Sequence, residues 1–352
     1  MIIMTEQPGD EVTSRRSVLN KRSTNIEVMR FLSAALVILS HAYPIVTGTK
    51  ETELLYRLTY GQLTFGGLAV SFFFFVGGYF AAGSVQKEEK SLGYITKRLK
   101  RLLPSLGIVV LLSIIMGGFL TELSIKEYLT SGKTWLYLLN TIMLPVHNLP
   151  GVFTGQPYAS TVNGALWTLP VEMACYMACL LWYRLGLSKP KKLWISIVFA
   201  GLVSAMGIIL GPRYEIIISV TRPCILFYMG MLYRLYGEHI RKSIWIALIC
   251  IGALIITSIY GGLYIAILLT LPYMINYFAF HDSINMPELL AQGGKISYAM
   301  YLVGFPIQQA LVALKITDTH TGNFVLGLLL DIVIASGITW INNKITQIRF
   351  FS

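Results

Sequence analysis

Charged residues are scarce in this chain. Asp, Glu, Lys and Arg make up 13% of its 352 residues, whereas hydrophobic residues make up 55%. A soluble domain carries about 25% charged residues, so the composition excludes an ordinary soluble protein. Apolar runs of about 20 residues recur along the whole length, and each is long enough to cross a bilayer core. Because these runs are continuous and do not alternate with polar residues, they predict an all-α, polytopic membrane protein and exclude a transmembrane barrel.

Cysteine is also rare, and recognisable catalytic motifs are missing. The four cysteines all fall within apolar runs, at Cys175, Cys179, Cys224 and Cys250. None of their spacings matches a zinc site or a disulfide framework, so we interpret them as small packing residues. The chain also lacks the G-x-S-x-G motif and the Gly-rich phosphate loop that ends in Lys-Ser/Thr. We therefore predict no metal site and no bound cofactor.

Ten apolar runs are long enough to be membrane spans. We place them at 28–46, 65–83, 102–120, 165–186, 192–210, 215–236, 243–260, 262–280, 296–315 and 323–343. The longest interruption, from Thr121 to Gly164, separates the third span from the fourth. It contains a further apolar patch, 135–144, whose ten residues are too few to cross a bilayer. We expect this patch to re-enter the membrane or to lie at its surface.

The basic residues predict the orientation of these spans. With a cytoplasmic N-terminus, about three quarters of the 28 lysines and arginines fall at cytoplasmic span ends, as the positive-inside rule expects. Both termini are then cytoplasmic. This topology accounts for the net charge of +11 without a nucleic-acid partner. The polar residues 1–24 are expected to form a disordered cytoplasmic segment ahead of the first span.

Two polar side chains stand out in the first span, Arg30 and His41. They are eleven residues apart, which is about three helical turns, so they share one helix face and lie roughly 16 Å apart along the axis. In the predicted topology Arg30 lies near the cytoplasmic surface and His41 lies in the outer leaflet. A polar pair on a membrane helix is costly unless it faces protein or water. Both residues are therefore functional candidates.

Three spans place a polar side chain at a similar depth below the outer surface: His41 in the first, Glu172 in the fourth and Arg222 in the sixth. Each is costly alone in a membrane, and pairing lowers that cost. One interpretation is a buried ion-pair network that only fixes helix packing. The other is a polar cavity open to the outside, with His41 as a base and Glu172 as its partner.

A basic segment between the second and third spans is a second candidate site. Arg98 and Arg101 are three residues apart there and share a helix face. Spacing alone favours an ordinary role for them, as topology determinants that contact anionic lipid. The alternative is a clamp for the phosphates of a nucleotide-like donor.

Five segments, in this order along the chain, carry a resemblance to a known family. They are I-E-V-M-R-F-L-S-A-A-L-V-I-L-S-H, G-G-L-A-V-S-F-F-F-F-V-G-G-Y, Y-I-T-K-R-L-K-R-L-L-P, A-L-W-T-L-P-V-E-M-A-C-Y and G-K-I-S-Y-A-M-Y-L-V-G-F-P-I. Together they resemble the motifs of acyltransferase family 3, membrane proteins that O-acylate bacterial cell-surface carbohydrates. The similar region is 25–347. It departs from the family at Gly304, where the last motif commonly has His, and in the final helix, which lacks the common Glu-Lys-Pro-like ending.

The resemblance implies a stand-alone O-acyltransferase, most simply an O-acetyltransferase, spanning the bacterial cytoplasmic (inner) membrane several times. Its donor would be cytoplasmic acyl-CoA, a substrate and not a bound cofactor. Its acceptor would be a hydroxyl of a surface carbohydrate or a lipid-linked glycan. The resemblance implies catalytic roles for His41, Glu172 and Arg30, with His41 as the general base or the acyl acceptor. The side chains expected to contact substrates are Arg98 and Arg101 for the donor, and Arg222, Trp167 and Tyr298 for the acceptor or the oxyanion.

A different class of protein also fits buried polar residues. A carrier or flippase of a polysaccharide-export pathway would use them as proton relays or as partners of substrate charges, without covalent chemistry. Such transporters often contain internal repeats. The halves 1–175 and 176–352 show no convincing repeat, which favours the enzyme.

Overall fold

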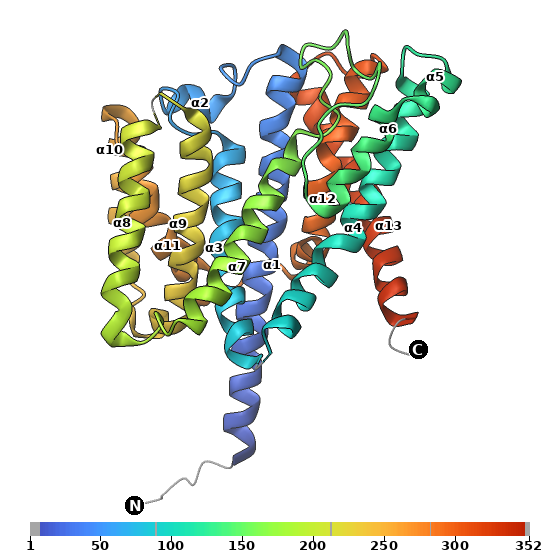
Figure 1. The fold of residues 1–352 in the computed structure, drawn as a ribbon. Helices are drawn as coiled ribbons and strands as arrows, with labels where there is room; N and C mark the ends of the chain where they lie inside the picture. The colour runs from blue at the N-terminus through green and yellow to red at the C-terminus, as the bar shows by residue number, and fades with distance from the viewer. Residues whose placement is uncertain (1–7, 89, 212, 282, 349–352) are drawn as a thin grey trace, which may run out of the picture.

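The computed structural model describes residues 8–88, 90–211, 213–281 and 283–348. These residues form thirteen α-helices and four short 3-10 helices, and within them the only strand-like pairing is an isolated bridge between Thr121 and Val152. The long helices run side by side through the molecule, and the shortest α-helices lie together at one end (Figure 1). The predicted all-α fold is therefore confirmed.

Ten of the α-helices match the ten predicted spans. They are α1 (Pro8–Thr47), α3 (Phe65–Lys87), α4 (Ser91–Leu120), α7 (Thr168–Arg184), α8 (Leu193–Leu210), α9 (Glu215–Tyr236), α10 (Ile244–Tyr260), α11 (Leu263–Phe280), α12 (Glu288–Ala313) and α13 (His320–Ile348). In the described part of the chain, nine helical segments are long and apolar enough to cross a membrane, and α10 is a shorter apolar helix of 17 residues. The chain is a multi-pass membrane protein.

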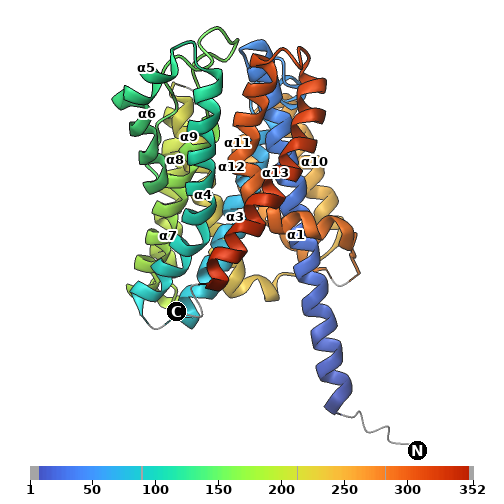
Figure 2. The ribbon, with the colours of Figure 1, turned by 90° about the vertical axis from the view of Figure 1, so that its right-hand side faces the viewer.

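The first helix is longer than its predicted span. It begins at Pro8, so the described part of the segment 1–24, which the composition predicts to be disordered, is helical. This extension projects from the bundle, away from all the other helices (Figure 2). It leaves the molecule at the same end as the last turn of α13 (Figure 1), as an even number of spans requires.

The interruption between α4 and α7 stays at the opposite end of the bundle. It forms α5 (Ile125–Thr130), α6 (Gly132–Leu136) and the 3-10 helices η1 (Tyr137–Ile142) and η2 (Gly164–Trp167), with α2 (Leu54–Leu58) at the same end. The Tyr128 hydroxyl donates to the Ile114 carbonyl of α4 at 2.8 Å, which ties α5 to the bundle. The patch 135–144 falls in α6 and η1, which are too short to cross a membrane, so that prediction is confirmed.

The centre of the bundle is closely packed through glycines. Gly78 of α3 and Gly230 of α9 face each other's helices, and an added Cβ on either would overlap the backbone carbonyl of Phe227 or Phe75. Gly294 of α12 faces the Glu27 backbone of α1 in the same way. Small residues let helix backbones approach within a membrane, where the hydrophobic effect does not drive helix association.

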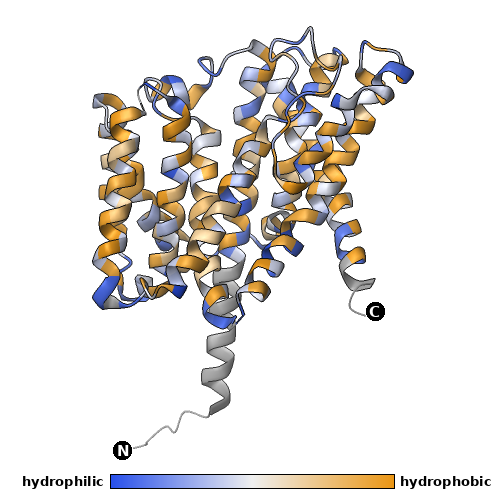
Figure 3. Cartoon of the chain, viewed as in Figure 1, coloured by the Kyte–Doolittle hydropathy of each residue, from blue (hydrophilic) through white to orange (hydrophobic). Residues whose placement is uncertain are grey.

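The outer helices present apolar side chains to the surroundings. α8 is coloured hydrophobic along most of its length, and the hydrophilic colours gather in the segment just before its lower end (Figure 3). Only 11% of the apolar stretch of α8 is buried inside the protein, whereas 72% of the corresponding stretch of α12 is buried. α8 is therefore a lipid-facing helix, whereas α12 belongs to the interior that holds the polar residues.

Candidate functional site

A small cavity of about 60 Å³ lies where five long helices meet. Three of its walls carry charge: Arg30 comes from α1, Arg101 from α4 and Glu172 from α7. α12 and the start of α7 add hydroxyl groups, from Thr168, Ser297, Tyr298 and Tyr301. The remaining wall is apolar and comes from α3 and Leu169, with Val70, Phe73, Phe74, Val76, Gly77 and Phe80. The cavity is thus lined by residues from all five motif-bearing segments.

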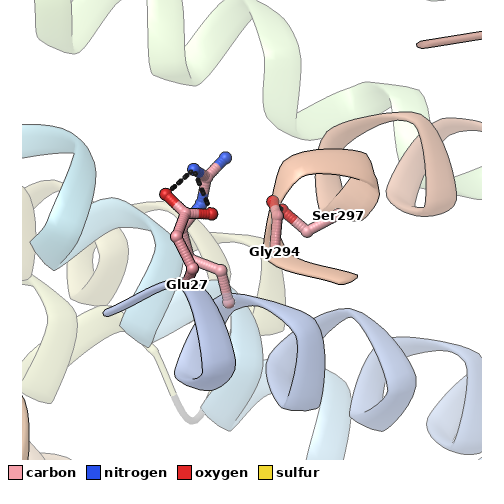
Figure 4. A network of polar contacts seen from close by, with 4 residues as sticks. Glu27, Gly294 and Ser297 are labelled. Carbon is pink, nitrogen blue, oxygen red and sulfur yellow. Dashed lines mark hydrogen bonds and ion pairs between the residues drawn. The ribbon is translucent and has the colours of Figure 1, made fainter. Parts of the chain in front are cut away.

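Arg30 is held at this cavity by Glu27, which precedes it by one turn on α1. Its Nη1 atom lies 3.0 Å from Glu27 Oε1 and 3.2 Å from Oε2, and both side chains remain partly exposed. Glu27 faces Gly294 and Ser297 of α12, and the Ser297 hydroxyl donates to the Gly294 carbonyl at 2.7 Å (Figure 4). The ion pair therefore sits on the contact between α1 and α12.

Glu172 is fixed by its own helix. The Tyr176 hydroxyl, one turn further along α7, donates to Glu172 Oε1 at 2.5 Å. Across the cavity, the Arg101 side chain is exposed, and the described residues give its guanidinium no hydrogen bond or ion pair. A cavity lined by two guanidinium groups, one of them without a hydrogen bond among the described residues, suits a ligand that carries negative charge.

Arg98 lies one turn before Arg101, but its side chain is buried. It is 7% exposed, and its guanidinium stacks between the rings of Tyr94 and Tyr176 at 5.2 and 4.9 Å. Its Nη2 atom donates to the Phe80 carbonyl at 3.2 Å. The structure therefore places Arg101 at the cavity surface and Arg98 behind it, where it supports Tyr176 and hence Glu172.

His41 lies outside the cavity lining, against α12. Its ring packs edge-on against Phe305, with centroids 5.0 Å apart. Phe305 follows Tyr301 by one helical turn, so one face of α12 leads from the cavity to His41. The described residues make no hydrogen bond to the His41 ring, and the side chain is partly exposed. Neither ring nitrogen therefore has a hydrogen-bond partner among the described residues.

The expected pairing of His41 with Glu172 is not formed among the described residues. Counting residues along a span predicts depth, but it does not predict which neighbouring helix a side chain faces. α7 packs mainly against α3, α9 and α4. Glu172 shares its cavity with Arg30 and Arg101.

The loop before α7 lies on α12 beside His41. Gln309 Nε2 donates to the carbonyls of Tyr158 and Thr161, both at 2.8 Å, and Asn163 Nδ2 donates to the Leu302 carbonyl at 2.8 Å. The Tyr158 ring packs edge-on against Phe305 at 5.8 Å. This loop and His41 therefore contact the same phenylalanine.

The remaining predicted residues occupy separate places. Tyr298 lines the cavity, and its hydroxyl donates to the Leu102 carbonyl at 3.1 Å. Trp167 ends η2, next to cavity-lining Thr168. Arg222 of α9 lies apart from Glu172, at the start of α3, where an added Cβ on Gly67 would be 2.7 Å from Arg222 Nη2.

Two residues at the site are not among those predicted from the sequence. Glu27 holds Arg30, and its position three residues before Arg30 is a signal for a helical ion pair. Thr168 exchanges a 2.7 Å hydrogen bond with the Tyr301 hydroxyl. That contact joins residues 133 positions apart, so no local pattern could predict it.

Residues 23–341 match the family described as acyltransferase domain, acyltransferase family 3. Among curated proteins, the chain is 24% identical over 340 residues to an O-acetyl transferase of Shigella phage Sf6, covering 94% of this chain and 97% of the relative. It is 27% identical over 241 residues to nodulation protein 10 of Rhizobium leguminosarum bv. viciae, covering 62% and 61% of the two chains.

A shorter match, 27% identical over 133 residues, joins the chain to acyltransferase MdmB of Streptomyces mycarofaciens and covers 37% of this chain and 32% of the relative. No solved structure matches the chain. The family match covers all five motifs and every residue of the cavity. The chain therefore belongs to acyltransferase family 3, as its motifs predict.

Proposed function

We propose that this protein is an O-acetyltransferase of the bacterial inner membrane that moves an acetyl group from cytoplasmic acetyl-CoA to a hydroxyl of a surface or lipid-linked polysaccharide. The observation that carries the proposal is the cavity with Arg30, Arg101 and Glu172 on its walls. Residues that line this cavity belong to family motifs on separate helices. A relative that matches over 94% of this chain and 97% of its own length is named an O-acetyl transferase.

The donor binds at the cavity, which lies at the Arg30 end of α1. Arg101 has no partner among the described residues, and Arg30 is oriented by Glu27. Guanidinium groups bind phosphate oxygens with two parallel hydrogen bonds, so these two arginines bind the anionic part of acyl-CoA. Arg98, which is stacked between two tyrosines, positions this wall and does not touch the donor.

The acceptor binds at the His41 end. His41 Nε2 or Nδ1 removes the proton from the attacking hydroxyl, whose oxygen forms a bond to the thioester carbonyl carbon. The carbon–sulfur bond then breaks, and the CoA thiolate takes up the proton that His41 held. In a two-step route, His41 first accepts the acyl group and then passes it to the hydroxyl, and the net bonds formed and broken are the same. The loop with Tyr158, which contacts Phe305 beside His41, lines the acceptor side.

The test is the transfer of labelled acetyl from acetyl-CoA to surface glycan. General-base catalysis contributes about 10²- to 10⁴-fold to a rate, so His41→Ala is expected to lower transfer by at least about 100-fold at normal expression. His239→Ala is the matched control, because His239 is exposed in the 3-10 helix that follows α9. Wild-type transfer by His41→Ala would contradict the assignment of the base.

Mass spectrometry of surface glycans separates the enzyme from a carrier. A strain without the gene is expected to export the polymer in normal amount but without ester groups. Loss of the polymer itself would favour the carrier or flippase.

A further inference from the structure

Arg222 is a buried arginine without a counter-ion. Its side chain is 7% exposed, and the described residues give its guanidinium no hydrogen bond and no ion pair; its Nε atom is fully enclosed. An arginine that is removed from water without a partner is strongly destabilising, because its desolvation is not compensated. Such a side chain needs an anion from outside the chain.

Two carboxylates at this end of the bundle have partners other than Arg222. Glu215, at the start of α9, forms an ion pair with Lys50. Glu53 accepts hydrogen bonds from the Ser40 hydroxyl at 3.2 Å and, at the start of α3, from the Phe65 amide at 2.5 Å. Neither carboxylate forms an ion pair with Arg222 among the described residues.

Arg222 faces the N-terminus of a long helix. Its Nη2 atom lies beside Gly67, in the first turn of the 23-residue helix α3. The N-terminal turn of a helix carries partial positive charge and favours anions. The Phe65 amide of this turn already donates to Glu53 and the Gly67 amide to Thr64. The helix therefore disfavours a second cation at this place, and the guanidinium of Arg222 supplies the hydrogen-bond donors for an oxyanion.

This site lies next to the predicted catalytic residue. Ser40, which precedes His41 on α1, packs against Gly66, where an added Cβ would be 2.9 Å from the Ser40 hydroxyl oxygen. The donor cavity has its own arginines, Arg30 and Arg101. Resting on the proposed function, we propose that Arg222, beside the first turn of α3, binds an anionic group of the acceptor, so that the acceptor is an acidic glycan.

The group is a carboxylate of a sugar acid or a phosphate that links the glycan to lipid. Three probes distinguish these sources on the full-length protein in lipid nanodiscs: glucuronate, inorganic phosphate and the neutral sugar glucose. We expect glucuronate or phosphate, but not glucose, to raise the thermal unfolding midpoint in a saturable way. Glucuronate alone identifies a sugar acid, and phosphate alone identifies the lipid linkage.

Variants of the site test the assignment. Arg222→Met removes the charge and keeps the length, so it is expected to weaken anion binding by about a hundredfold, whereas Arg222→Lys retains part of it. Gly67→Ala fills the space beside Nη2 and is expected to weaken binding with the arginine in place. Arg57→Met is the matched control, since Arg57 is exposed in α2.

The proposal is overturned if wild type binds neither anion, or if Arg222→Met binds both as well as wild type. Equal stabilisation by chloride would show an adventitious ion only and would overturn it too. Without ligand, Arg222→Met is expected to unfold at a higher temperature than wild type, because it removes an uncompensated buried charge. A lower temperature would show that Arg222 has a partner within the chain.

The two proposals can fail separately. Anion binding is measured without acetyl-CoA, so it does not depend on transfer. If the protein binds anions but transfers acetyl to a neutral glycan, the proposed O-acetyltransferase activity stands and the proposed acidic acceptor is wrong.

Discussion

Arg98 and Arg101 are one helical turn apart on α4, and their surroundings assign them different roles. Arg98 is stacked between Tyr94 and Tyr176, and Tyr176 holds Glu172. Arg101 lines the cavity without a hydrogen bond among the described residues. One of the two is therefore free to bind a donor, and the other supports the wall that faces it.

Replacing each arginine by methionine tests this division. Arg101→Met is expected to raise the KM for acetyl-CoA about 10- to 100-fold with a smaller change in kcat, because it removes a contact to the bound donor. Arg98→Met is expected to lower the thermal unfolding midpoint, because it removes two stacking contacts and the hydrogen bond from Arg98 to the Phe80 carbonyl.

Lys100→Met is the matched control, since Lys100 is exposed on the same helix. It should change neither KM nor stability. If Arg98→Met raised the KM as much as Arg101→Met at unchanged stability, both arginines would contact the donor.

Glu53 lies in a loop outside the membrane-spanning helices, and its burial predicts that the stability of the protein depends on pH. Burial raises the pKa of its carboxyl from the ordinary value of about 4.5 to about 7, and the Phe65 amide and Ser40 hydroxyl limit the rise. The folded protein then keeps a proton that the unfolded chain has released between about pH 4.5 and 7. Stability therefore falls as the pH rises through this window, by on the order of 1 to 3 kcal/mol, and levels off above it.

Glu53→Gln isolates this contribution. Glutamine can accept from the Phe65 amide and donate to Ser40, but it does not titrate. The difference in unfolding midpoint between wild type and variant, measured from pH 4.5 to 8, is expected to change across the window. A constant difference would show that the carboxyl titrates normally.

Part of the site could be predicted from the sequence. The helical period places Arg30 and His41 on one face, and the structure has both on the side of α1 that meets α12. The partner of Glu172 could not be predicted, because residue counting does not determine the rotation of α7 about its axis. The burial of Arg98 depends on Tyr176, which is 78 residues away in the chain.

At the scale of whole elements, α3 and α9 are held together through glycines. Gly78 and Gly230 bring the two backbones so close that neither position accepts a Cβ without displacement. α3 carries the apolar wall of the cavity, whereas α9 carries Arg222. Their contact therefore links the cavity to the anion site.

Gly78→Ala tests the importance of this contact. The added methyl would overlap the Phe227 carbonyl, so we expect a loss of stability of about 3 kcal/mol and a lower unfolding midpoint. In Gly107→Ala, on α4, the methyl would meet nothing within 4 Å. That control is expected to change stability by no more than about 1 kcal/mol. Equal midpoints for the two variants would contradict the close contact.

The positions of the helices along the chain follow from the sequence, and their neighbours do not. Length and hydropathy identify the ten long apolar helices, nine of which, in the described part of the chain, are long enough to be candidate membrane spans. Lipid-facing and protein-facing sides are both apolar, so hydropathy does not predict that α8 lies outside and α12 inside. Only small residues such as Gly78, Gly230 and Gly294 indicate the contacts in advance.

At the scale of the whole molecule, we infer different entrances for the two proposed substrates. Arg30 and His41 lie on α1, about three turns apart, with the cavity at Arg30 and the loop containing Tyr158 beside His41. The charge pattern predicts a cytoplasmic Arg30 end, and both described ends of the chain lie at that end of the bundle (Figure 1). We infer that the acyl group crosses the membrane along α1 and α12 while CoA stays inside.

The most direct test of this account is a vectorial transfer assay with the purified protein in sealed liposomes of known orientation. Labelled acetyl-CoA is supplied on the side of the N-terminus and polysaccharide on the other. If the acyl group crosses the membrane along α1 and α12, labelled polysaccharide appears on the far side and CoA on the near side, and both are lost in His41→Ala. Transfer that occurs only when donor and acceptor share one side would contradict this path.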